Sequence, residues 1–134
     1  MASTLTLEIV TPDRKFFEDE VEKVVVRGLE GDIGVLRNHI PLVTPLAIGR
    51  VKIKQNGEYR IAAVAEGYLD ITETKTTIVT DAAEWPDEID LNRAELAKQR
   101  AEEKLKKKDK NIDYDRAEIA LRKAINRINV AKRG

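Results

Sequence analysis

The chain contains no cysteine, and aromatic residues make up only 4% of its 134 residues. Without cysteine there is neither a disulfide framework nor a thiolate metal site, and a reducing compartment suits such a chain. No apolar run approaches the roughly 18 residues of a membrane-spanning helix, so we expect no direct membrane insertion. The first residues also lack the charged start and apolar stretch of a signal peptide.

Nucleophiles and metal ligands are equally scarce, since the chain has one serine, Ser3, and one histidine, His39. A histidine in a turn is more often a structural or interface residue than a base, and metal sites need clusters of ligands. The glycine-rich segment 28–34 lacks the lysine of a phosphate loop, and its acidic residues would repel phosphate. We therefore predict no catalytic residue, no metal and no catalytic cofactor.

The formal net charge of zero hides an asymmetry. Residues 1–87 carry a net charge of −5, and residues 88–134 carry +5. A basic C-terminal part could bind a phosphate-bearing ligand, or it could be a solvated helix pair. Nucleic acid is not expected as a partner, because Tyr114 is the only aromatic residue in the basic part.

Residues 1–86 have the pattern of a strand domain. Thr4–Val10 alternates apolar and polar residues, as a half-buried strand does. The dipeptide Asn56-Gly57 predicts a type I′ hairpin turn, because both residues tolerate positive φ. Pro12, Pro41 and Pro45 separate the segments. The expected strands are 4–10, 20–27, 51–54, 59–64, 67–71 and 76–80, which together predict an antiparallel β-sandwich or flattened barrel.

Residues 87–134 have a different pattern, rich in Ala, Leu, Lys and Glu. We expect helices over 90–107 and 113–132, joined by the charged turn 106–111 into an antiparallel hairpin. The fold class is thus α+β with segregated elements. The apolar stripes consist of Ala94, Ala97, Ala101 and Leu105 in the first helix and Ala117, Ala120, Leu121, Ala124, Ile128 and Ala131 in the second. Alanine buries little area, so we expect a marginally stable hairpin.

The phrase Ile-Asp-x-x-Arg-Ala-Glu occurs at 89–95 and again at 112–118, at the start of each predicted helix. Asp90 and Asp113 are plausible N-caps. Arg93 and Arg100 fall within about 20° of each other on a helix and flank the alanine stripe, and Arg127 holds the same flank of the second helix. Two interpretations remain open: a polyphosphate site built from these guanidiniums, or ordinary capping in both copies.

Two segments of the chain carry a resemblance to a known family. They are residues 30–46, Glu-Gly-Asp-Ile-Gly-Val-Leu-x-x-His-Ile-Pro-Leu-Val-Thr-Pro-Leu, and residues 66–71, Glu-Gly-Tyr-Leu-Asp-Ile. With the alanine-rich hairpin they resemble the ε subunit of bacterial F-type ATP synthase, in order and over essentially the whole chain. The resemblance implies a non-catalytic subunit of the rotating central stalk, peripheral to the cytoplasmic face of the bacterial membrane. It also implies domains at 1–86, which contacts the γ subunit and the c-ring, and at 87–134, which regulates ATP hydrolysis by switching between compact and extended states.

Site residues follow from the same resemblance. It implies c-ring contact by Glu30, Gly31 and Asp32, and γ contact by His39. It implies that ATP, as a regulatory ligand with or without Mg²⁺, contacts Glu84, Ile89, Asp90, Arg93, Ala94, Arg100, Lys123 and Arg127. The inhibitory helix would meet the α and β subunits through Arg116, Arg122, Lys123 and Arg127.

One position departs from the related ATP-binding motif, because Lys123, with Arg122 beside it, stands where the motif has arginine. A lysine loses the bidentate fork of a guanidinium. A rival hypothesis is a purely structural stalk coupler that never binds nucleotide. An independent enzyme is a more distant alternative.

Overall fold

The computed structural model describes residues 3–133. The chain forms two compact units, of which the first ends at Glu84 and the second begins at Trp85. We call them the strand unit and the helical unit, and we describe each by itself.

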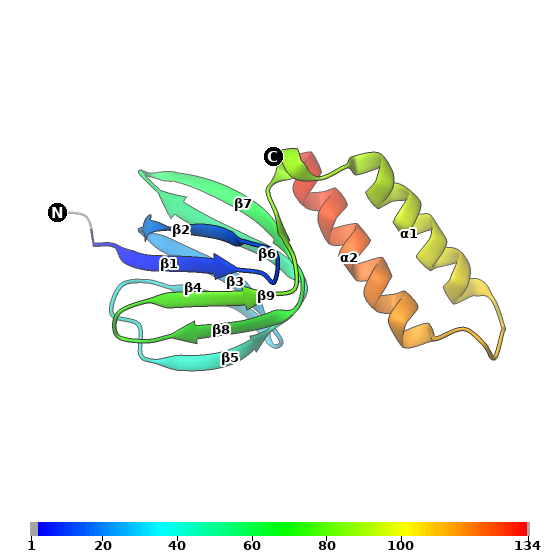
Figure 1. Cartoon of the computed structure of the whole chain (residues 1–134), viewed down its shortest axis with the longest axis horizontal. Coiled ribbons are helices and arrows are strands. Elements are labelled where there is room, and N and C mark those ends of the chain that lie inside the picture. Colours follow the sequence, from blue (N-terminus) through cyan, green and yellow to red (C-terminus); the bar gives the residue numbers. More distant parts are fainter. Residues whose placement is uncertain (1–2, 134) are drawn as a thin grey trace. The chain divides into compact units, whose positions relative to one another are not determined.

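From residue 3 onward, the strand unit contains ten strands in one continuous hydrogen-bonded sheet that folds into a sandwich (Figure 1). The strands are β1 (Leu5–Val10), β2 (Lys15–Val21), β3 (Lys23–Gly28), β4 (Gly31–Val35), β5 (Leu42–Leu46), β6 (Gly49–Gln55), β7 (Glu58–Val64), β8 (Gly67–Ile71), β9 (Thr76–Thr80) and β10 (Ala83–Glu84). Their order is β10-β7-β6-β3-β5-β8-β9-β1-β2, and β4 pairs with β3. These pairs are antiparallel except β1 with β9, which run parallel.

The core of the strand unit follows from residue alternation. In β1, Leu7 and Ile9 are fully buried, while Glu8 between them is only half-buried. The same period of two buries one face of β3, β6, β8 and β9. The fully buried large aliphatic residues of the strand unit are Leu7, Ile9, Val21, Val24, Val26, Val35, Val51, Ile53, Leu69 and Ile78. The prediction of a strand sandwich followed by a helical hairpin is confirmed.

The turn between β6 and β7 is also confirmed. Asn56 and Gly57 have φ of 53° and 78°, as a type I′ turn requires. Gln55 pairs with Glu58 across this two-residue loop.

The expected strand over 20–27 is wrong, because the chain bends at Glu22 between β2 and β3. Val21 and Val24 are both fully buried, and one continuous strand cannot place residues three apart on the same face. The bend resolves this conflict, and the Glu22 amide donates to the Lys54 carbonyl at 2.8 Å. Strands β4 and β5 were not anticipated, since glycine and proline obscure their alternation.

The helical unit consists of a 3₁₀ turn, η1 (Pro86–Glu88), and helices α1 (Leu91–Lys106) and α2 (Tyr114–Arg133). Figure 1 shows the two helices side by side and antiparallel. Small residues line the seam between the two helices, as expected: Ala94, Ala101, Ala117 and Ala124 are buried. Ala120 was expected in this seam but is exposed, although it lies only about 60° around α2 from Ala117 and about 40° from Ala124.

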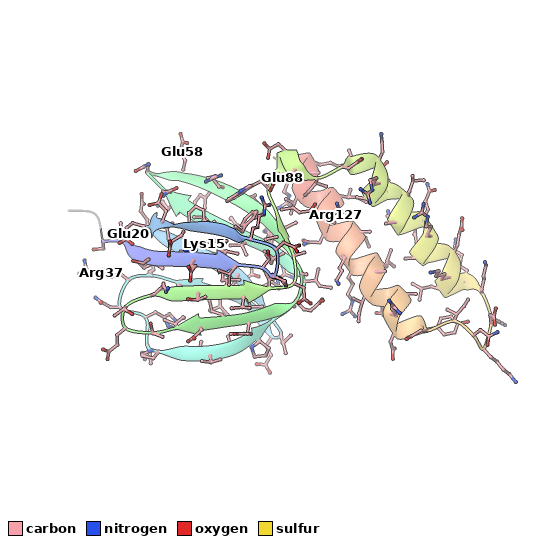
Figure 2. The ribbon with its side chains drawn as sticks, viewed as in Figure 1. Lys15, Glu20, Arg37, Glu58, Glu88 and Arg127 are labelled. Carbon is pink, nitrogen blue, oxygen red and sulfur yellow. The ribbon has the colours of Figure 1, made fainter. Side chains whose placement is uncertain are left out.

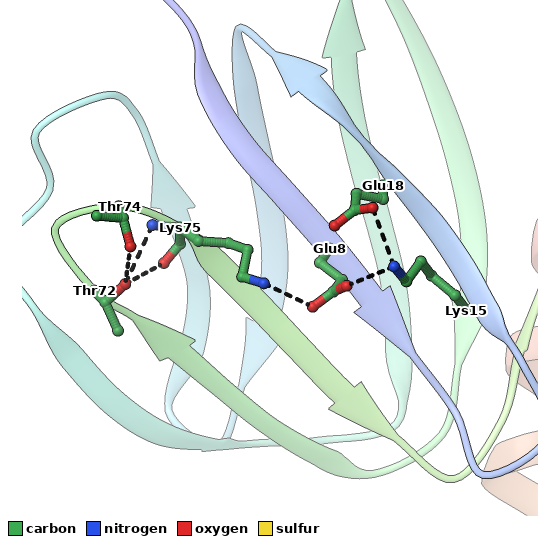
Figure 3. A network of polar contacts seen from close by, with 6 residues as sticks. All are labelled: Glu8, Lys15, Glu18, Thr72, Thr74 and Lys75. Atoms are coloured by element: carbon green, nitrogen blue, oxygen red, sulfur yellow. Dashed lines mark hydrogen bonds and ion pairs between the residues drawn. The ribbon is translucent and has the colours of Figure 1, made fainter.

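A network of charged side chains crosses one surface of the strand unit (Figure 3). Glu8 pairs with Lys15 at 3.3 Å and with Lys75 at 3.2 Å, and Lys15 also pairs with Glu18 at 3.1 Å. The hydrogen bond from Lys75, assisted by Lys15, lowers the pKa of Glu8 despite the opposing effect of desolvation. The bonds to Glu18 and Glu8 raise the pKa of Lys15. The network ties β1 and β2 to the turn between β8 and β9.

Candidate functional site

The two copies of the repeated motif have the same local geometry. The Asp90 carboxylate accepts from the Arg93 amide at 3.1 Å, and the Asp113 carboxylate accepts from the Arg116 amide at 3.1 Å. Both aspartates therefore cap their helices, which confirms the predicted N-caps. The alanine after each arginine is buried in the hairpin. The shared motif thus has a structural role in both copies, whatever ligand it meets.

The arginine side chains of the motif are not used by the caps. Arg93 and Arg100 are exposed, two turns apart on α1. Within residues 3–133, neither guanidinium has a hydrogen bond or ion pair. Both guanidiniums are available to an anionic ligand.

Helix α2 offers two kinds of cation. Arg122 is exposed and pairs with Glu118, one turn before it, at 3.0 Å. Lys123 and Arg127 are half-buried and have partners of their own. Figure 2 shows Arg127 on α2. Of the neighbours Arg122 and Lys123, the half-buried Lys123 therefore lies nearer the packed side of the helix.

The remaining residues of the expected ATP site lie on different elements. Ile89, directly before the cap, is 9% exposed. Glu84 is half-buried in β10, where it pairs with Ala63, and belongs to the strand unit. Glu88 accepts from the Trp85 amide at 2.9 Å and holds η1, a contact that the sequence reasoning missed. The spacing Trp85-x-x-Glu88 before a helix was the available signal.

In the expected c-ring contact, Glu30 lies in the two-residue turn between β3 and β4, and Gly31 and Asp32 begin β4; all three residues are exposed. Arg27 Nε lies 2.7 Å from Asp32 Oδ1, so one of the two carboxylates is already neutralised. Leu29 at the same turn is 68% exposed. A shallow hollow of about 440 Å³ lies beside this turn.

The expected γ contact, His39, lies in the loop between β4 and β5. Its Nδ1 is 2.8 Å from the Ile40 carbonyl oxygen, and since a carbonyl only accepts, Nδ1 carries the proton. This loop lines a hollow of about 750 Å³ whose wall also includes Glu20 and Arg37, both labelled in Figure 2. Leu36 and Ile40 are 56% and 78% exposed, a feature typical of contact surfaces. Sequence reasoning missed these two residues, although Ile40 stands directly before Pro41 in a polar segment.

Residues 3–133 also show neither a metal-ligand cluster nor a membrane-spanning helix. No group of three or more His, Asp or Glu side chains there could hold a metal ion. No helix in that range is long and apolar enough to cross a membrane.

Comparison with known families decides the affiliation. The β-sandwich domain of ATP synthase δ/ε chains matches residues 4–86, and the long α-helix domain of the same chains matches residues 87–132. The chain belongs to the ATP synthase ε family. The family resemblance inferred from residues 30–46 and 66–71 is confirmed.

Individual relatives agree with this assignment. An ATP synthase epsilon chain from Alkaliphilus metalliredigens is 54% identical over 132 residues, covering 98% of each chain. One from Caldicellulosiruptor bescii is 47% identical, covering 94% of this chain and 92% of the relative. A chain in the mitochondrial ATP synthase of Euglena gracilis superposes with a TM-score of 0.79 at 25% identity, covering 90% of this chain and 76% of the other.

Proposed function

We propose that this ε-family chain is a central-stalk subunit of an F-type ATP synthase whose helical hairpin senses ATP. In this proposal the strand unit joins the γ subunit, through the His39 loop, to the c-ring, through Glu30–Asp32. The chain lies peripherally at the cytoplasmic face of the membrane. ATP acts as a regulatory ligand and not as a substrate.

The proposal of ATP sensing rests on the different contacts made by the aspartate and the arginines at the start of α1. Asp90 is occupied with capping, while Arg93 and Arg100 present guanidiniums without partners among residues 3–133. A guanidinium matches phosphate oxygens bidentately. With Lys123 and Arg127 on the second helix, these side chains would bridge a triphosphate across the hairpin.

The alanine seam makes the hairpin responsive to such a ligand. Each buried alanine contributes one methyl group, worth roughly 0.8 kcal/mol, so the closed hairpin is marginal. A ligand that binds only the closed form adds about 1.4 kcal/mol at ten times its Kd. ATP would thus favour the compact state. At low ATP the helices would extend toward the α and β subunits and inhibit hydrolysis.

The ATP site is tested by titration calorimetry of the isolated chain with ATP, using matched variants of the two repeats. Arg93→Ala should weaken binding roughly tenfold to a hundredfold, because a hydrogen bond to a charged group is worth about 1.5–3 kcal/mol. Arg116→Ala removes the same side chain from the second copy and should bind ATP as the unmodified chain does. Equal heats from Arg93→Ala and the unmodified chain would exclude the site.

Inhibition is tested in the assembled enzyme with cations outside the ATP set. Arg116→Gln/Arg122→Gln should raise ATP hydrolysis at low ATP roughly fivefold, since exposed ion pairs with a partner contribute about 0.2–1 kcal/mol each. Lys106→Gln/Lys108→Gln removes the same charge from the end of α1 and the connector and serves as the control. If both pairs leave hydrolysis unchanged, α2 is not the inhibitory element.

The rival function, a passive coupler, rests on one specific observation. Asp90 and Asp113 make the same cap with the same distance, so the motif needs no ligand to explain it. A coupler predicts no ATP heat from the unmodified chain.

A further inference from the structure

The Tyr114 side chain makes hydrogen bonds at two points of the connector between α1 and α2, residues 107–113. The Tyr114 hydroxyl donates to the Lys107 carbonyl oxygen and accepts from the Asp109 amide at 3.2 Å. Tyr114 is the first residue of α2, and Lys107 is the C-cap residue of α1. A single phenol therefore joins the end of one helix to the start of the next.

Asp109, whose amide donates to the Tyr114 hydroxyl, also makes two further hydrogen bonds of the connector. Its carboxylate accepts from the Asn111 amide at 2.9 Å, and its carbonyl accepts from the Ile112 amide at 3.3 Å. The Tyr114 hydroxyl completes this set by engaging the Asp109 amide. The connector is thus a defined turn.

Two forces work against such a closed turn. The last carbonyls of a helix lack partners within it, and Lys107 supplies one of them here. Five lysines crowd this end of the hairpin and repel one another: Lys104, Lys106, Lys107, Lys108 and Lys110. The phenol satisfies the carbonyl and holds the chain closed against this repulsion.

The corresponding position in the first copy of the motif is Leu91. Leucine has no hydroxyl, and the first copy follows η1 instead of a helix end. The copies share the aspartate cap and the buried alanine but differ at this position. The difference matches the extra task of Tyr114, which caps the preceding helix as well as starting its own.

We propose that Tyr114 is a positioning residue that fixes the register of α2 against α1 and so sets the spacing of the cations that would hold ATP. This inference rests on the proposed function for its ligand. Arg93 and Arg100 lie on α1, and Lys123 and Arg127 lie on α2, so their spacing depends on the connector. Loss of the phenol hydroxyl loosens the hairpin and weakens ATP binding without unfolding either helix.

The test compares Tyr114→Phe with Tyr59→Phe in the full chain. Phenylalanine keeps the ring and removes only the hydroxyl. Tyr59 lies in β7, is 48% exposed, and its hydroxyl has no hydrogen bond within residues 3–133. Since the chain has no cysteine, spin labels at Gln99→Cys and Ala120→Cys, both exposed positions, report the distance between the helices.

Without ATP, Tyr114→Phe should broaden the distance distribution and speed amide hydrogen exchange at Asp109 and Ile112 roughly twofold to tenfold. Its ATP Kd should rise by a similar factor at unchanged helix content, and saturating ATP should restore the narrow distribution. Tyr59→Phe should change none of these. A merely structural role would lower the melting temperature and leave the Kd unchanged.

The two proposals fail differently. Unchanged exchange and distance in Tyr114→Phe would overturn the positioning role, even if the unmodified chain binds ATP. No ATP heat from the unmodified chain would overturn ATP sensing, while the ATP-free distances still decide whether Tyr114 sets the register. If Tyr114→Phe loses helix content, Tyr114→Leu, which copies Leu91 of the first repeat, must show the same broadening for the inference to stand.

Discussion

The strand unit and the helical unit are stabilised in different ways. The strand unit buries large aliphatic side chains completely, among them Leu7, Ile53, Leu69 and Ile78. The helical unit buries fewer large side chains, Ile89, Ile128 and Val130, together with four alanine methyl groups along its seam. Hydrophobic stabilisation grows with the apolar area removed from water, so the strand unit has far more of it per residue. The strand unit therefore has the larger hydrophobic stabilisation against a change of conformation, and the helical unit has the smaller one.

The largest expected effect tests the rigidity of the strand unit at Gly67. A Cβ atom there would lie 1.9 Å from the Val79 carbonyl oxygen and 2.8 Å from Thr80 Cα, both backbone atoms of the neighbouring strand. Gly67→Ala must push β8 and β9 apart, so we expect a loss of about 3 kcal/mol in the free energy of unfolding, the upper end for overpacking. Urea unfolding followed by the circular dichroism of the strands measures it.

The matched control for that variant is Gly34→Ala in β4. A Cβ at Gly34 would approach only Lys23 Cε, at 3.6 Å, which is ordinary contact. We expect a change within about 0.5 kcal/mol, as at most surface positions. If the two variants unfolded alike, close strand contact at Gly67 would not be a source of rigidity.

A smaller effect is expected from the helix caps. Asp90→Ala and Asp113→Ala should each destabilise the hairpin by about 1 kcal/mol, the usual cost of losing an N-cap. Amide hydrogen exchange of α1 and α2 should accelerate, whereas β8 and β9 should keep their protection. Because both caps have the same geometry, the two variants should agree in the absence of ATP. Acceleration that spread equally to the strands would contradict the separation of the two units.

Residue patterns predict most of this fold because local rules and tertiary structure agree. Alternation located β1, β8 and β9, the Asn56-Gly57 dipeptide located a turn, and aspartates before alanine stripes located both helices within two residues of their ends. The bend at Glu22 was not predicted, because the residues on both sides of it favour strand and form one continuous run in the sequence. Strands β4 and β5 were missed because Gly31 and Gly34 in β4 and Pro45 in β5 interrupt the alternation of apolar and polar residues.

The candidate site was less accessible to sequence reasoning. Composition and spacing located the arginines of α1. Only the structure shows that their guanidiniums have no partner among residues 3–133. Tyr114 carried no signal, because its partners Lys107 and Asp109 are backbone groups whose position depends on the folded connector. Side chains that bind the backbone of another segment are generally invisible to motif analysis.

The smallest expected effect concerns the charged network on the strand unit and its response to pH. Lys75 and Lys15 lower the pKa of Glu8, so the folded state binds this proton less readily than the unfolded chain does. The contribution of Glu8 to stability is therefore complete above the ordinary glutamate pKa of about 4.3. It is lost as the pH falls through the lowered folded value.

Glu8→Gln should remove part of the acid dependence of strand-unit unfolding between about pH 5 and pH 3 and leave the hairpin unaffected. Urea titrations at several pH values measure this difference, with Glu58→Gln at the exposed start of β7 as the control. An unchanged acid dependence in Glu8→Gln would mean that the ion pairs add nothing to the rigidity of the strand unit, which would then come from its apolar core and strand pairing.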